Sequence, residues 1–290
     1  MFIRRLPKFD YHAPASLPEA LDLLASYGDD AKLLAGGTDL LLAMKKRTAT
    51  PAHVINLKTI PGLSGISGDA KGLTIGALTT IADIKRSALV RETYTPLWDA
   101  VSVMGSPQVR TLATLGGNLV SAVPSADTAP PLIVLSAQAH FIGPSGERTC
   151  PVEALFSAPS TCSLASTDIL THVTVPFPQG KGAYLKLMRR AALDLAIVSV
   201  AAFVSLDADK VCTYARIALG AVAPTPVRAT AAEMIIEGKV LTEALAAEAG
   251  RVSGTECFPI TDVRSSLEYR CSMVEVLTER ALLEALKRSN

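Results

Sequence analysis

The chain has 290 residues, more than one compact core usually organises, and this length predicts two or three domains. Hydrophobic residues make up 49% and charged residues 19%, a composition that supplies ample apolar material for cores and argues against disorder. The 28 lysines and arginines nearly balance 27 acidic residues. A net charge of +1 gives no reason to expect nucleic acid or an acidic membrane surface as a partner.

Neither a secretory signal nor a membrane span is predicted. The first ten residues carry positive charge, but no apolar run follows them. The most apolar stretch, Leu195 to Leu206, is too short to cross a bilayer. We therefore expect a cytoplasmic protein with no integral membrane segment.

The cysteines and histidines are scattered and form no pattern typical of a metal site or a catalytic group. They are Cys150, Cys162, Cys212, Cys257 and Cys271, with His12, His53, His140 and His172. No two cysteines have CxxC spacing, and no HExxH motif occurs. We expect reduced thiols, no metal bound by this chain and no catalytic side chain.

The first 57 residues predict a small α/β unit of alternating strands and helices. Ser16 is typical of a helix cap, with Pro18 in the first turn and Glu19 three residues on, and Gly28 ends this helix. Residues 31–35 form a short apolar run that predicts a strand. Further elements are expected as a strand before the first helix, a second helix at 38–47 and a strand at 53–57.

The pattern changes near residue 58, where glycines begin to punctuate short β-branched runs. The expected elements are a strand at 73–75, helices at 80–89, 94–103 and 112–123, and strands at 138–142 and 169–175. A proline- and glycine-rich stretch at 176–182 predicts a boundary. Beyond it we expect strands at 195–206 and 216–222 and helices at 229–238, 241–250 and 263–287. The predicted domains are 1–57, 58–177 and 178–290, and the class is α+β.

The most informative local feature is a glycine pair at the end of an apolar run, in the order Leu34, Ala35, Gly36, Gly37, Thr38, Asp39, Leu40. A turn without side chains lets an anion approach backbone N–H groups, and a helix start adds a favourable dipole. Thr38 is suited either to cap the helix or to donate its hydroxyl to a phosphate. By itself, one glycine pair is more often an ordinary turn than a ligand site.

A second glycine pair follows about eighty residues later, in the order Thr114, Leu115, Gly116, Gly117, Asn118. Two such turns suit the two anionic groups of a diphosphate, and Asp127 adds a carboxylate able to accept hydrogen bonds from ribose. Neither pair lies in a P-loop or in a Rossmann GxGxxG motif. The residues alone therefore predict a plausible dinucleotide site and no more.

These segments resemble a known family. Residues 35–40 followed by Met44 and Lys45 resemble the first flavin loop in the medium subunits of molybdenum hydroxylases, and residues 105–118 are similar to the second loop. Further likeness lies in segments 125–132, 184–190, 194–196, 220–229 and 262–270. The likeness covers nearly the whole chain, with its motifs in order.

The resemblance implies a vanillyl-alcohol-oxidase-type (PCMH-type) FAD-binding fold in two subdomains, plus a C-terminal α+β domain. The two glycine pairs would grip the FAD pyrophosphate, while Asp127, Leu170 and Lys186 match further positions at the cofactor. The implied FAD-binding residues are Leu34, Ala35, Gly36, Gly37, Thr38, Asp39, Leu40, Thr114, Leu115, Gly116, Gly117, Asn118, Asp127, Leu170 and Lys186.

The resemblance also implies a function as the electron-transfer subunit of a heteromeric enzyme. A large partner would hold the molybdenum cofactor, and a small partner would hold [2Fe-2S] clusters. Electrons would reach FAD and then NAD, a quinone or another acceptor, in a dimer of heterotrimers. No cysteine lies between Val90 and Pro130, so we expect no extra iron–sulfur cluster of the hydroxybenzoyl-CoA reductase type.

Two other functions stay open at this point. The chain could be a free-standing FAD-dependent oxidoreductase, although no substrate-binding residues stand out. It could instead be a flavin-free scaffold with the same fold, which the two intact glycine pairs disfavour. The residues after the first glycine pair, Thr38 and Asp39, differ from those frequent in carbon monoxide dehydrogenases and argue against carbon monoxide as substrate.

Overall fold

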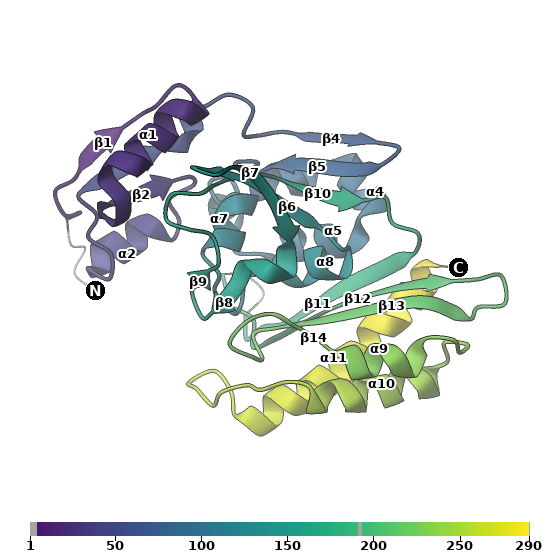
Figure 1. Cartoon of the computed structure of the whole chain (residues 1–290). Coiled ribbons are helices and arrows are strands. Elements are labelled where there is room, and N and C mark those ends of the chain that lie inside the picture. The colour runs from purple at the N-terminus through teal and green to yellow at the C-terminus, as the bar shows by residue number, and fades with distance from the viewer. Residues whose placement is uncertain (1–4, 191–192, 290) are drawn as a thin grey trace.

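The computed structural model describes residues 5–190 and 193–289. Its three larger sheets follow one another along the chain, and each is built from one continuous part of it. Figure 1 shows the N-terminal unit in purple, a central unit in blue and teal, and a C-terminal layer in green and yellow. The helices of the C-terminal layer lie on the side of its sheet that faces away from the central unit.

The N-terminal unit is a parallel three-stranded sheet with two helices. Its strands, in sheet order, are β1 (Asp10–His12), β3 (His53–Asn56) and β2 (Ala31–Leu34), and its helices are α1 (Leu17–Tyr27) and α2 (Leu40–Lys46). Ser16 caps α1 by accepting a hydrogen bond from the backbone N–H of Glu19, as its pattern predicts. Ala20 and Leu24 of α1 pack on Ile55, so an amphipathic helix face closes this small core.

The central unit is an antiparallel five-stranded sheet with a group of short helices on one face. In sheet order the strands are β4 (Ile66–Asp69), β5 (Gly72–Gly76), β10 (Ile169–Pro176), β6 (Gln138–Gly143) and β7 (Gly146–Pro151). The helices are α3 (Ile81–Arg86), α4 (Ala88–Thr93), α5 (Thr95–Val103), α6 (Pro107–Arg110), α7 (Leu115–Val120) and α8 (Ala129–Val134). A hairpin of β8 (Phe156–Ala158) and β9 (Thr161–Cys162) follows. Single 3₁₀ turns occur at Gly28–Asp30, Leu57–Thr59 and Val152–Leu155.

The C-terminal unit packs an antiparallel sheet on three helices. The strands are β11 (Lys181–Leu187), β12 (Val198–Leu206), β13 (Cys212–Gly220) and β14 (Val227–Arg228), and the helices are α9 (Thr230–Ile236), α10 (Glu243–Thr255) and α11 (Leu267–Arg288). Alternate residues of β12 point to opposite faces. Val198 and Val200 therefore join the core under the helices, while Ala201 and Phe203 join the core of the central unit. This sheet is buried on both faces.

Most predicted elements are present, with differences that have local causes. The helix expected at 112–123 is shorter because Thr114 caps it, and the long C-terminal helix begins at Leu267 because Ser266 caps it. Helix α8 was not among the expected elements, and its two prolines lie in its first turn, where proline is tolerated. No helix in the described part of the chain is long and apolar enough to cross a membrane. The domain boundaries after 57 and 177 stay a prediction.

Candidate functional site

The fold brings the two glycine pairs into contact. Gly36 lies directly after β2, and a Cβ at this position would overlap the backbone carbonyl of Leu112, which precedes the second pair. The hydroxyl of Ser121, at the end of α7, donates to Asp39 Oδ2 over 3.0 Å. The two segments are therefore neighbours at the seam between the N-terminal and central units, and only glycine allows this close approach at position 36.

The first glycine pair keeps its backbone amides available. Gly37 adopts a φ of +74°, a conformation that L side chains rarely take. Within the described residues, the N–H groups of Gly36, Gly37, Thr38 and Asp39 donate no hydrogen bond. Lys58 Nζ donates to the carbonyl of Ala35 over 2.9 Å and places a positive charge beside the turn. Free N–H groups next to a cation fit an anionic group such as a phosphate.

Thr38 does not cap α2, because the capping position is occupied by Asp39, whose side chain makes no capping hydrogen bond. Of the two roles open to Thr38 from the sequence, the hydroxyl donor toward a phosphate remains a prediction.

The second glycine pair is built differently from the first. It lies inside the first turn of α7, and its amides already have partners within the chain: Leu115 N–H donates to Thr79, Gly116 N–H to Ala77 and Gly117 N–H to the hydroxyl of Thr114. A Cβ on Gly116 would lie 2.9 Å from the carbonyl oxygen of Ala77. This pair therefore serves close packing of α7, and the sequence-based expectation of free amides does not describe it.

Asp127 and Lys186, two of the predicted site residues, form a buried ion pair. Lys186 Nζ lies 2.8 Å from Asp127 Oδ2, and their side chains are 1% and 8% exposed. Tyr184 donates its hydroxyl to Asp127 Oδ1 over 2.7 Å. Burial raises the pKa of Asp127, while the neighbouring ammonium acts in the opposite direction. Burial also raises the pKa of Tyr184 well above its ordinary value, which keeps it a neutral donor.

This pairing changes the role expected for Asp127. Each carboxylate oxygen accepts one hydrogen bond from β11, so Asp127 orients Lys186, and its contact with a cofactor stays a prediction. Tyr184 was not predicted as a site residue. The sequence could have indicated it through its spacing from Lys186, because residues two apart on a strand point to the same face. Tyr184 and Lys186 are related in this way on β11.

Asn118 joins the second glycine pair to the segment that carries Asp127. Its side-chain oxygen accepts from the backbone N–H of Thr128 over 3.2 Å and from the Thr128 hydroxyl over 2.6 Å. Thr128 is fully buried and directly follows Asp127. A displacement of α7 would therefore be transmitted to the Asp127–Lys186 pair.

Leu170 lies on β10, behind the second glycine pair. Its side chain is 6% exposed and belongs to the central core. The next residue, Thr171, accepts a hydrogen bond from Ala77 N–H over 2.9 Å, and the carbonyl of Ala77 in turn holds Gly116. Leu170 thus belongs to the frame that supports α7, and its contact with a cofactor stays a prediction.

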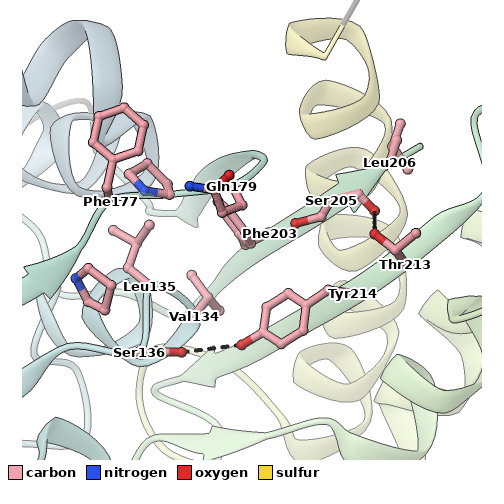
Figure 2. Close-up of a pocket in the computed structure, with 12 residues that line it drawn as sticks. Val134, Leu135, Ser136, Phe177, Gln179, Phe203, Ser205, Leu206, Thr213 and Tyr214 are labelled. Carbon is pink, nitrogen blue, oxygen red and sulfur yellow. Dashed lines mark hydrogen bonds between the residues drawn. The ribbon is translucent and has the colours of Figure 1, made fainter. Parts of the chain in front are cut away.

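A cavity of about 450 Å³ lies elsewhere, where the linker after β10 meets β12 and β13. Figure 2 shows Tyr214 in its wall with its hydroxyl pointing at Ser136, 3.2 Å from Ser136 Oγ. The Phe203 ring packs edge-on against Tyr214, and Phe177 also lines the cavity. Its lining carries no charged side chain and none of the predicted site residues. We therefore assign it no part in holding an anionic cofactor.

Comparison with known proteins decides which family carries this architecture. Residues 7–178 match the family described as the FAD binding domain in molybdopterin dehydrogenase, and residues 183–285 match the CO dehydrogenase flavoprotein C-terminal domain. The chain belongs to the FAD-binding subunits of molybdenum hydroxylases.

Relatives extend over nearly the whole chain. The medium chain of carbon monoxide dehydrogenase from Hydrogenophaga pseudoflava is 36% identical over 286 residues, which cover 97% of this chain and 98% of that one. The xanthine dehydrogenase FAD-binding subunit of Escherichia coli O157:H7 is 31% identical over 281 residues, with 95% of each chain covered. These relatives are subunits of oxidoreductases, so the expectation of an oxidoreductase subunit is confirmed.

Solved structures confirm the predicted fold class. A carbon monoxide dehydrogenase structure from Hydrogenophaga pseudoflava contains a chain that superposes with a TM-score of 0.95 at 35% identity, covering 99% of this chain and 100% of that one. Quinoline 2-oxidoreductase from Pseudomonas putida 86 contains another, with a TM-score of 0.93 at 30% identity, covering 98% and 99%.

The comparisons also confirm the cofactor expected from the resemblance. FAD is the cofactor of this family of subunits, and the molybdenum cofactor and iron–sulfur clusters belong to partner subunits. The named substrates of the relatives differ, so the comparisons single out none, and the expectation against carbon monoxide stays a prediction.

Proposed function

We propose that this chain passes electrons between the [2Fe-2S] clusters of a small partner subunit and an external acceptor such as NAD or a quinone. In this proposal a large partner subunit carries the molybdenum cofactor and the substrate chemistry, and the assembly is a dimer of heterotrimers. The observation that carries the proposal is the meeting of the two glycine pairs in a chain of this family.

The chain's own residues would bind and orient FAD. The free N–H groups of Gly36 to Asp39, with Lys58 beside them, would hold the diphosphate. Asn118 would keep α7 in place, and Lys186, fixed by Asp127, would present a buried positive charge to the cofactor. FAD itself would supply the redox chemistry, because no side chain of this site is suited to it.

The experiment that tests this role uses the iron–sulfur subunit as electron donor. This subunit would be reduced with dithionite, freed of excess reductant and mixed without oxygen with the FAD-loaded chain. We expect the flavin absorbance to bleach, and NAD or a water-soluble quinone to restore it. A flavin that stays oxidised beside the reduced iron–sulfur subunit would refute the proposed role.

The free-standing alternative predicts a different result in the same experiment. An enzyme of that kind would have its flavin reduced by a small organic substrate with no partner subunit present. Reduction that requires the iron–sulfur subunit would exclude it.

A further inference from the structure

Two cysteine sulfurs of the C-terminal unit lie in contact with each other. Cys257 follows the end of α10 by two residues, and Cys271 lies near the start of α11. The S–H group of Cys257 faces Cys271 Sγ over 3.4 Å and the carbonyl of Gly254 over 3.2 Å. A disulfide needs about 2.05 Å between its sulfurs, so a small rotation of the side chains would join them.

The packing of α10 against α11 holds the two sulfurs in this arrangement. The two helices lie side by side in Figure 1. A Cβ on Gly250 would lie 2.5 Å from the carbonyl oxygen of Glu275, so a glycine of α10 lets α11 approach closely. Just after Cys257, the N–H of Phe258 donates to the carbonyl of Val222 over 2.8 Å. Backbone contacts therefore fix the positions from which the thiols meet.

The two thiols differ in their access to solvent. Cys257 is 6% exposed, whereas Cys271 is partly exposed. Burial, followed by the hydrogen bond to Cys271, raises the pKa of Cys257 to about 12, and this thiol therefore stays protonated. A small oxidant in solution meets Cys271 first, and Cys257 stands behind it as a second thiol. An exposed thiol beside a resolving thiol is the arrangement typical of reversible cysteine oxidation.

We propose that Cys257 and Cys271 form a reversible disulfide when the protein meets hydrogen peroxide. The Cys271 sulfur attacks one peroxide oxygen and the O–O bond breaks, which gives a sulfenic acid, and the other oxygen leaves as water with the thiol proton. The Cys257 sulfur then attacks the sulfenic sulfur, the S–O bond breaks, and the hydroxyl leaves as a second water with the Cys257 proton. Two thiols are oxidised and one peroxide is reduced to two waters. A thiol reductant restores both cysteines by exchange.

The disulfide would close a covalent ring around the loop between α10 and α11. Within this loop Asp262 accepts hydrogen bonds from the guanidinium groups of Arg264 and Arg270. A crosslink across the loop lowers the conformational entropy of the unfolded chain, so the oxidised protein should be the more stable form. The inference is independent of the proposed function, because neither cysteine belongs to the candidate flavin site.

Peptide mapping of the full-length chain tests the pairing directly. The reduced protein would be treated with a small excess of hydrogen peroxide, its remaining thiols blocked with N-ethylmaleimide, and the product digested with trypsin without a reductant. Arg264 and Arg270 lie between the two cysteines, so trypsin places them on separate peptides. We expect mass spectrometry to find these two peptides joined, and separated again by dithiothreitol. A blocked and unlinked Cys257, whatever the state of Cys271, would overturn the proposal.

Matched variants test whether the disulfide stabilises the protein. Cys271→Ala removes one partner, and Cys150→Ala removes another partly exposed thiol that has no bond to the pair. Peroxide should raise the melting temperature of the wild type and of Cys150→Ala by roughly 5 °C, and dithiothreitol should reverse the change. Cys271→Ala should show no such rise. An equal rise in Cys271→Ala, or no rise in the wild type, would contradict a stabilising link between these two cysteines.

Discussion

At Gly36 the smallest possible side chain already collides with a segment that lies far away in the sequence. The obstacle is the backbone carbonyl of Leu112, which cannot rotate aside as a side chain can. At Gly117 the atom nearest to an added Cβ is the hydroxyl oxygen of Thr114, at 2.9 Å. Two glycines that look alike in the sequence therefore tolerate substitution differently.

Gly36→Ala should lower the free energy of unfolding by about 1–3 kcal/mol and weaken FAD binding, because the turn must move away from Leu112. Gly117→Ala should change the free energy of unfolding by less than about 1 kcal/mol, because the higher helix propensity of alanine offsets the displacement of the Thr114 hydroxyl. Urea denaturation with and without FAD measures both. Equal stability and equal FAD affinity of the two variants would show that the close approach at Gly36 is unimportant.

The buried pair of Asp127 and Lys186 gives a second prediction at this scale. Asp127→Asn leaves the ammonium of Lys186 in the interior without a carboxylate, and the free energy of unfolding should fall by about 3–5 kcal/mol. Tyr184→Phe removes one hydrogen bond to the same carboxylate and should cost about 0.5–1.5 kcal/mol. Urea denaturation at one pH compares them. A smaller loss in Asp127→Asn than in Tyr184→Phe would contradict the ion pair.

Among the elements, α7 links the first glycine pair to the turn that holds Asp127. Asn118→Ala removes the acceptor for both hydrogen bonds of Thr128, and the free energy of unfolding should fall by about 1–3 kcal/mol. Asn118→Asp keeps an oxygen acceptor in the same place and should recover part of that loss. If the Asn118→Ala and Asn118→Asp variants unfold at the same urea concentration, the hydrogen bonds between Asn118 and Thr128 do not contribute to stability.

Strands β6 and β10 carry a stacked histidine pair that predicts a pH dependence. The rings of His140 and His172 lie 4.2 Å apart, and burial lowers the pKa of both, while their proximity lowers that of His140 further. The folded state therefore favours neutral imidazoles. Their contribution is complete above the ordinary pKa of about 6.5 and is lost as the pH falls below it.

The measurement for this pair is the urea midpoint at about pH 7.5 and at about pH 5.5. The wild-type midpoint should fall more on acidification than that of His172→Gln, in which one titrating ring is absent and the other has lost its neighbour. Equal decreases of the urea midpoint in the two proteins would show that the acid sensitivity arises from other residues.

Local sequence patterns predicted the elements better than their contacts. Ser16, Glu19 and Gly28 mark the ends of α1 correctly because caps act within a few residues. The helix that carries Pro130 and Pro131 was not predicted, although both prolines lie in its first turn, where proline is compatible with a helix. The resemblance put Asp127 and Lys186 in one site, but their direct pairing joins residues 59 apart, which no local pattern encodes.

At the scale of the whole molecule, the candidate site lies at the interfaces between the three units. The two glycine pairs meet where the N-terminal and central units touch, and the Asp127–Lys186 pair spans the central and C-terminal units. Such a site depends on all three units packing together. The family motifs could be read from the sequence, whereas the hydrogen bond of Gly116 could not, because its acceptor, the carbonyl of Ala77, lies on a segment before α3.

The most direct test of the central claim is identification of the cofactor that the purified chain releases on denaturation, after its visible absorption spectrum has been recorded. The account predicts a yellow protein that releases FAD and that retains less of it after Gly36→Ala. A colourless chain that takes up no added FAD would contradict the account and favour a flavin-free scaffold.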